Sequence, residues 1–374
     1  MKTFLAILFI MLFPLSALAG ETIRVLLKDD QQRLEVKVDG EVICYDGQGN
    51  LMEMHLDEAM LELETIDGAL HINGIPVPRP PLKIKAIAGQ MGVNGIRLQS
   101  ELEIRKKPGG LVQAIALLDM EEYLKGVVPA EASPKWELEV LKAQAVAART
   151  YALYKKKSQA GGDYDVTADV NSQVYSGNGL RSPISDRAVD ETAGLVLTYD
   201  GKLINAMFHG CCGGETEDVG AVFGKPVEYL KSVEGMCPPH GSKMQWEKWF
   251  SASEIQDALE RKGYRIGKVR DIRVAAQSDS DRVTRLVITH SKGELSMKGN
   301  DFRKAMGWEV VPSTRFAVKK TKGGRYRFEG KGSGHGVGLC QLGAREMGLQ
   351  GKNFEEILLH YYTDVKIEPY RPDM

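Results

Sequence analysis

The chain has 374 residues, with 49 Lys or Arg against 50 Asp or Glu and a net charge of −1 at pH 7. Hydrophobic residues make up 43% of it, enough to bury a core, so disordered, collagen-like and small disulfide-scaffold classes are excluded. A charge this close to zero also disfavours a nucleic-acid binder that acts through bulk charge.

The first 19 residues have the pattern of a secretory signal. Lys2 precedes an apolar run from Phe4 to Phe13, and Ala17-Leu18-Ala19 resembles a cleavage site. The run is shorter than the roughly 20 residues that span a bilayer, so a retained anchor is the weaker alternative. No later apolar stretch is long enough for a transmembrane helix. We therefore expect cleavage near Ala19 and export to the periplasm or the cell-wall space.

Residues 20–115 are expected to form a β-rich N-terminal domain. Apolar and polar residues alternate over 33–38 and 41–45, on both sides of Asp39-Gly40, so the pattern predicts a hairpin with a type I′ turn. Asn73-Gly74 and Asn94-Gly95 mark further turns. The Pro-rich stretch 75–81 favours a connector or an edge strand.

Residues 116–374 are expected to form a mixed α+β domain, which makes the fold class α+β. A short helix over 120–127 is predicted to stop at Pro129, and a longer one to begin with Ser133 as N-cap and Pro134 at its first position. Its apolar stripe is Leu138, Leu141, Ala145, Ala148 and Ala152. Capped helices follow Ser182 and Ser251, and strands are predicted over 195–199, 202–208, 269–275, 283–290 and 294–297, with a last helix near 301–306.

Glu131 is a candidate general acid. It lies between the two predicted helices, next to Val127, Val128 and Pro129, and apolar neighbours that desolvate a carboxyl raise its pKa. A raised pKa suits a group that protonates a glycosidic oxygen. The alternative is that Glu131 merely favours the N-terminal dipole of the following helix.

Two further segments carry unusual residues. His335 lies among alternating glycines, at 332, 334, 336 and 338, which either bring backbone close to a ligand or form a tight structural turn. His209, Cys211 and Cys212 precede Cys237 and His240. In an oxidising compartment we expect a disulfide from Cys237 to Cys211 or Cys212, which leaves Cys44 and Cys340 as free thiols. A zinc site of two Cys and two His is the alternative, and no other metal or cofactor is expected.

Six ordered motifs in the C-terminal two thirds give the chain a resemblance to a known family. They are Glu122-Tyr-Leu-Lys-Gly-Val-Val-Pro-Ala-Glu131, Leu141-Lys-Ala-Gln-Ala-Val-Ala-Ala-Arg149-Thr-Tyr151, Gln173-Val-Tyr175-Ser-Gly177, Phe208-His-Gly-Cys-Cys-Gly-Gly-Glu-Thr-Glu217, Glu228-Tyr-Leu-Lys-Ser-Val233 and Gly334-His-Gly-Val-Gly-Leu-Cys-Gln-Leu-Gly-Ala344. From about Leu117 to Tyr370 the sequence resembles the stage II sporulation protein D (SpoIID/LytB) family of bacterial cell-wall proteins.

The resemblance implies a lytic transglycosylase that cleaves peptidoglycan glycan strands, preferring strands stripped of stem peptides. The family's catalytic acid/base matches Glu131, and its basic groove residues match Lys142 and Arg149. By the same resemblance we expect Gln173, Tyr175, His209, His335 and Gln341 to contact substrate. One carboxyl suffices, because the substrate's own 6-hydroxyl closes onto the anomeric carbon to give a 1,6-anhydro product.

The sequence departs from the family pattern in one loop and leaves two rival functions open. Structurally studied members carry His and Cys zinc ligands where this chain has residues 165–173, a segment with neither. Some relatives are described as enhancers of a partner amidase, so a non-catalytic wall-binding modifier is the first rival. A zinc amidase is the second, and it lacks a convincing ligand set.

Overall fold

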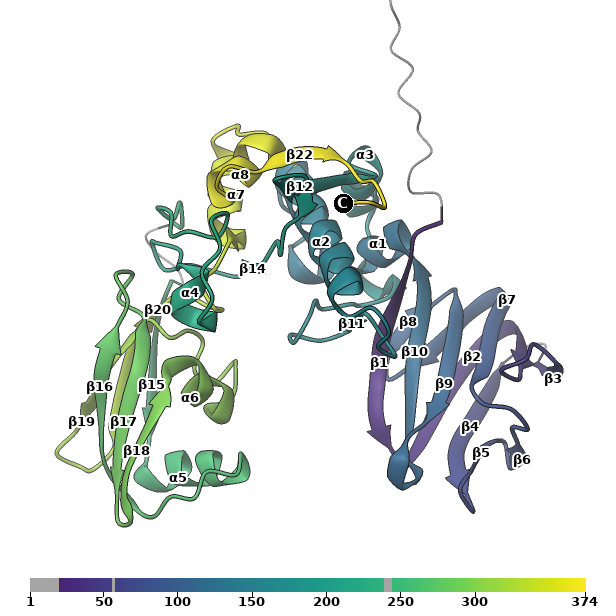
Figure 1. Ribbon diagram of the computed structural model, residues 1–374, viewed down its shortest axis with the longest axis horizontal. Coiled ribbons are helices and arrows are strands. Elements are labelled where there is room, and N and C mark those ends of the chain that lie inside the picture. The colour runs from purple at the N-terminus through teal and green to yellow at the C-terminus, as the bar shows by residue number, and fades with distance from the viewer. Residues whose placement is uncertain (1–19, 56–57, 239–243) are drawn as a thin grey trace, which may run out of the picture.

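The computed structural model describes residues 20–55, 58–238 and 244–374, so the expected signal segment lies outside the described residues. The fold is α+β, as predicted, and Figure 1 shows an N-terminal sheet, a helical part that follows it and a green part of short sheets and helices, after which the chain returns to the helical part. Each part has its own hydrophobic core. No helix of the described residues combines the length and apolarity needed to cross a membrane.

The N-terminal sheet has eleven strands among the described residues, in the order β11-β1-β10-β9-β7-β2-β4-β5-β6, with β3 beside β2 and β8 beside β7. The strands are β1 (Thr22–Gln31), β2 (Arg33–Tyr45), β3 (Leu51–His55), β4 (Ala59–Ile66), β5 (Ala69–Ile72), β6 (Ile75–Pro76), β7 (Leu82–Val93), β8 (Ile96–Leu98), β9 (Glu101–Lys106), β10 (Val112–Asp119) and β11 (Val166–Thr167). The boundary expected at residues 115 and 116 therefore falls inside β10.

The hairpin predicted at Asp39-Gly40 is wrong, because β2 runs through it as one strand paired with β7. Gly40 stands opposite Gly89, and a Cβ on Gly40 would lie 2.4 Å from the carbonyl oxygen of Ala88. Two glycines thus let the strands approach at a bulge, where the dipeptide pattern suggested a turn. The turns predicted at Asn73-Gly74 and Asn94-Gly95 are confirmed, with positive φ at all four residues.

The helical part is built around α2, which both the first and the second core share. Its helices are α1 (Met120–Glu131), α2 (Leu138–Ser158), α3 (Pro183–Glu191), α4 (Val219–Phe223), α7 (Gln341–Leu349) and α8 (Phe354–Tyr361), with a single turn at Asn178–Leu180. Its strands are β12 (Leu195–Tyr199), β13 (Lys202–Leu203), β14 (Phe208–His209), β21 (Leu339–Cys340) and β22 (Lys366–Pro369). A further turn, Pro108–Gly110, joins β9 to β10 in the N-terminal sheet.

Two predicted boundaries in this part are wrong. α1 passes through Pro129, since the buried Val127 and Val128 hold its last turn and the Ala132 N–H closes it on the Val128 carbonyl. α2 begins at Leu138, because Ser133 caps only a local turn, in which the Trp136 N–H donates to its carbonyl.

The helices and strands predicted over 251–306 are confirmed, and the same core holds three further strands that the sequence did not predict. Strands β16 (Val269–Gln277), β17 (Val283–His290) and β18 (Gly293–Lys298) form one sheet and β15 (Gln245–Phe250), β20 (Tyr326–Lys331) and β19 (Phe316–Lys320) another, with α5 (Ala252–Arg261) and α6 (Gly299–Met306) beside them. The predicted capping box of α5 is present, from Ser251 to Glu254.

Candidate active site

Glu131 is the last residue of α1, in contact with a loop that is fastened to the same helix. The Ser176 N–H and hydroxyl both donate to the Gly126 carbonyl, at 3.1 and 2.9 Å. Tyr175 lies against Gly126 so closely that a Cβ there would stand 2.4 Å from its ring. These contacts place the Val174 N–H against the Glu131 carboxyl. The close packing of Tyr175 against Gly126 explains why a glycine stands inside this helix.

Only neutral donors contact the Glu131 carboxyl in the described structure. Oε1 accepts from the Val174 N–H at 2.7 Å, and Oε2 accepts from the Gln341 amide at 3.3 Å. Burial raises the pKa of Glu131 above its ordinary value, while these two hydrogen bonds stabilise the carboxylate and oppose that rise. Among the described residues no second carboxyl contributes to the shift. The side chain keeps part of its surface exposed, so the arrangement can donate and regain a proton.

The alternative role for Glu131 at the start of the next helix is excluded. Glu131 ends α1, and α2 begins seven residues later at Leu138. A helix C-terminus disfavours a carboxylate, so the helix end acts in the same direction as burial.

Gln144 belongs to the site although sequence reasoning did not select it. It is buried on α2, and its Oε1 accepts from the same Gln341 amide, at 3.3 Å, that reaches Glu131. Its own amide nitrogen is buried without a partner among the described residues. The signal in the sequence was a polar residue among the alanines of α2.

Lys142 and Arg149 both pair with carboxylates, and the burial of Arg149 corrects the expectation that it contacts substrate. Arg149 is fully buried and makes two hydrogen bonds to Glu121, at 2.8 and 2.6 Å, so it offers no surface to a ligand. Lys142 lies between Glu139 and Glu191, at 2.8 and 2.7 Å. The basic face of α2 therefore pairs with carboxylates of α1 and α3 as well as its own.

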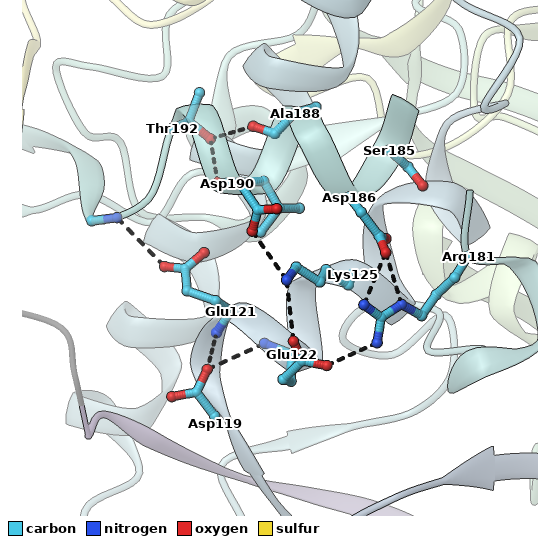
Figure 2. Close-up of polar contacts among 12 residues, drawn as sticks. Asp119, Glu121, Glu122, Lys125, Arg181, Ser185, Asp186, Ala188, Asp190 and Thr192 are labelled. Atoms are coloured by element: carbon cyan, nitrogen blue, oxygen red, sulfur yellow. Dashed lines mark hydrogen bonds and ion pairs between the residues drawn. The ribbon is translucent and has the colours of Figure 1, made fainter. Parts of the chain in front are cut away.

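The other end of α1 carries a dense ionic network (Figure 2). Asp119 caps the helix, Lys125 lies between Glu122 and Asp190, and Arg181 links Glu122 to Asp186. This network fixes α1 against α3 and so holds the helix whose far end carries Glu131.

Gln173 and Tyr175 are buried supports of the site, contrary to the expectation that they contact substrate. Gln173 is 0% exposed, accepts from the Tyr123 hydroxyl at 3.0 Å and donates to the Ala148 carbonyl. Tyr175 is 4% exposed and stacks on Tyr123 with 5.4 Å between ring centroids. Both side chains position the loop that meets Glu131.

His209 and His335 lie together, with ring centroids 5.5 Å apart. His209 is buried, and its Nδ1 faces the Val337 carbonyl at 3.1 Å. His335 keeps some exposure, its Nδ1 accepts from the Val337 N–H, and burial together with Arg303 and Arg282 lowers its pKa to about 3. Both rings are therefore neutral at pH 7, and of the two only His335 reaches the surface.

Cys340 joins the cluster in which sequence reasoning placed Cys211, Cys212 and Cys237. The Sγ atom of Cys237 lies 3.1 Å from those of Cys212 and Cys340 and 3.5 Å from that of Cys211. No disulfide links them. His240 lies outside the described residues. Cys44 is buried far away, in the first core.

The zinc site that structurally studied relatives carry does not fit the loop over 165–173. The Asp165 carboxylate pairs with Arg24, and that of Asp169 accepts from Thr167 and Asn171, so both are occupied. Two surface hollows, of about 570 Å³ beside β15 and β20 and about 330 Å³ beside β1 and the start of that loop, are not lined by Glu131.

In this α+β protein the candidate site is thus one desolvated carboxyl with a raised pKa, contacted by neutral donors. The profile of the stage II sporulation protein family matches residues 109–199, which include Glu131, and a domain of unknown function (DUF8618) matches residues 228–338. The chain belongs to the stage II sporulation protein D family.

Of three curated relatives, two carry names that support this assignment. A stage II sporulation protein D of Bacillus amyloliquefaciens is 31% identical over 67% of this chain and 74% of its own length. An uncharacterized protein of Brachyspira hyodysenteriae is 32% identical over 93% of both chains. The amidase enhancer of Bacillus subtilis is 30% identical over 66% of this chain but only 40% of its own length.

Proposed function

We propose that the protein is a peptidoglycan lytic transglycosylase with Glu131 as its one acid and base. The observation that carries the proposal is the environment of that carboxyl. It is desolvated, it accepts hydrogen bonds from two neutral donors, and no cation contributes to its pKa shift. Glycoside hydrolases of the common kind need two carboxyls about 5 to 9.5 Å apart. A transglycosylase needs one, since an internal hydroxyl replaces water.

In this mechanism the protonated Glu131 donates its proton to the glycosidic oxygen as the bond to the anomeric carbon breaks. The resulting carboxylate stabilises the cationic sugar. It then takes the proton of the sugar's 6-hydroxyl while that oxygen bonds to the anomeric carbon. Glu131 ends protonated, one strand ends in a 1,6-anhydro sugar, the other gains a free hydroxyl, and no water is consumed.

The surroundings of Glu131 stabilise both of its protonation states. Gln341 and the Val174 N–H stabilise the carboxylate, while burial favours the acid, so both protonation states are accessible within one cycle. The rest of the proposal is export of the chain after removal of residues 1–19, with residues 20–115 as a β-rich domain that positions the site on the cell wall.

The test is to incubate the mature chain with purified glycan strands, with and without stem peptides, and to analyse the products by mass spectrometry. We expect 1,6-anhydro ends from the wild-type protein and from Glu122→Gln, which alters a carboxyl on the same helix. Glu131→Gln should lose on the order of 10² to 10⁴ in rate. Intact strands with the wild type, or hydrolytic ends that take up ¹⁸O from water, would refute the proposal.

A second candidate function is favoured by the name of one relative, the amidase enhancer. If this chain acts in that way, it binds glycan without cutting it. Adding a cell-wall amidase distinguishes the two functions. Faster release of stem peptides with both the wild type and Glu131→Gln, and no anhydro products from either, would favour the enhancer.

A further inference from the structure

Four cysteine thiols from distant parts of the chain converge beside the candidate active site. β14 pairs in parallel with β21, so His209 stands opposite Cys340, and Cys211 and Cys212 follow directly. Cys237 completes the group with its thiol 3.1 Å from two of the others. Cys211, Cys212 and Cys340 are all at most 1% exposed.

The His209 ring supplies a second and independent observation. Its Nδ1 faces the Val337 carbonyl, so the proton lies on Nδ1 and the lone pair on Nε2. Nε2 is buried and has no partner among the described residues. One ring nitrogen lies within 4.8 Å of the thiols of both Cys212 and Cys340. An imidazole oriented through a backbone carbonyl is the usual arrangement of a metal ligand.

We propose that His209, Cys212, Cys237 and Cys340 bind one zinc ion. Three thiols lose their protons on binding, so Zn²⁺ enters, three protons leave and the site carries a net charge of −1. Three sulfurs and one imidazole are a usual tetrahedral set for structural zinc. Zinc–sulfur bonds of about 2.3 Å imply sulfur separations of roughly 3.8 Å, which the cluster reaches by a small expansion.

The surroundings suit thiolates. The N–H groups of Cys212 and Gly343 point at the Cys340 sulfur, at 3.2 and 3.4 Å, and Cys340 caps the N-terminus of α7. Arg282, only 2% exposed, donates to the carbonyls of Cys212 and Glu215 at 2.6 and 3.0 Å. Its positive charge balances the negative charge of the loaded site.

A disulfide explains less of this geometry. Cys237 is equally close to Cys212 and Cys340, and a bond to either leaves the His209 lone pair buried without a partner among the described residues. A zinc ion uses all four groups. The Cys211 thiol, 3.5 Å from that of Cys237, stays outside the coordination sphere.

The site lies one residue from the proposed catalytic machinery. Gln341 follows Cys340 and donates to Glu131, so zinc fixes the start of α7 and with it that amide. Zinc here is structural. The proposal stands or falls separately from glycan cleavage, because its test measures metal and thiols.

The test is the metal content of the full chain purified without added metal or reductant. We expect one zinc per chain, three thiols that react only after a chelator is added, and visible thiolate-to-metal bands after exchange for Co²⁺. Cys340→Ser and His209→Gln should each lower zinc occupancy at least tenfold. Cys211→Ser and Cys44→Ser are the matched controls and should keep it.

Two results would overturn the proposal. One is a metal-free protein in which peptide mapping finds Cys237 disulfide-bonded to another cysteine. The other is zinc that survives His209→Gln but is lost in Cys211→Ser, which would replace the imidazole by a fourth thiolate. Metal content is measured only on variants that are soluble and that circular dichroism shows to be folded. If His209→Gln or Cys340→Ser does not fold, His209→Asn or Cys340→Ala takes its place.

Discussion

Each end of α1 carries a glutamate, and the pKa values of these two side chains are shifted in opposite directions. Burial opposes ionisation of Glu122, but the hydrogen bonds from Lys125 and Arg181 outweigh it and lower its pKa. Burial also opposes ionisation of Glu131, and there only neutral donors act against it, so the pKa is raised. The two glutamates lie nine residues apart on one helix. Whether the partners of each carboxyl are charged or neutral decides whether that carboxyl is a structural anion or a proton donor.

The largest expected effect on stability comes from Arg149, the buried cation that pairs with Glu121 at the N-terminal end of α1. Arg149→Met leaves Glu121 without its bidentate partner and removes the guanidinium donor of the Leu195 carbonyl, while the Val189 carbonyl keeps its bond from the Thr192 N–H. We expect the free energy of unfolding to fall by about 3 to 5 kcal/mol. Lys142→Met, which removes a pair that keeps contact with solvent, should cost under about 1 kcal/mol. Urea denaturation measures both, and equal losses would contradict the structural role of Arg149.

The middle of α1 gives the next effect. In Gly126→Ala the new methyl group would stand 2.4 Å from the Tyr175 ring, so the loop that carries Val174 must move. We expect a loss of about 1 to 3 kcal/mol and slower glycan cleavage. Gly179→Ala is the matched control, since no atom lies within 4 Å of its added Cβ. An unchanged cleavage rate in Gly126→Ala would show that the loop does not position the site.

A smaller effect is expected on the pH dependence of the melting temperature, which should differ in sign between variants of Glu131 and Glu122. The raised pKa of Glu131 means that its stabilising contribution is present below about 4.5 and is lost as the pH rises through the folded value. Glu131→Gln should therefore melt higher than the wild type at pH 7, with the difference shrinking near pH 4. The lowered pKa of Glu122 reverses the sign, so Glu122→Gln should melt lower at pH 7 and approach the wild type on acidification. Calorimetry at both pH values decides, and shifts of the same sign would break the comparison.

The smallest effect tests whether the ends are independent. Lys125→Met removes two partly screened pairs, to Glu122 and Asp190, and should cost about 0.2 to 1 kcal/mol. Because the two ends share no partner, the pH profile of glycan cleavage should not move. A shift of its limbs would reveal coupling along the helix.

Sequence reasoning reached Glu131 and the elements over 251–306, but it missed the sheet of β15, β19 and β20 and misjudged α2. The predicted stripe, Leu141 to Ala152, is the face toward the first core. A second face, with Val140, Ala143, Val146 and Ala147, borders the second core and went unnoticed, because small residues give a weak hydrophobic pattern. A helix buried on both faces makes its polar residues structural, which is why Arg149 pairs with Glu121 and why Gln144 reaches the site.

The sequence by itself determined the family, the α+β class, most turns and the residue types that can carry acid chemistry, since local pattern and ordered motifs encode these. Only the tertiary structure decided which charges meet. It ended α1 at Glu131 with neutral neighbours, paired the buried Arg149 with Glu121, and brought Cys340 across 128 residues to Cys212. Such pairings depend on the packing of distant segments, and spacing along the chain does not contain them.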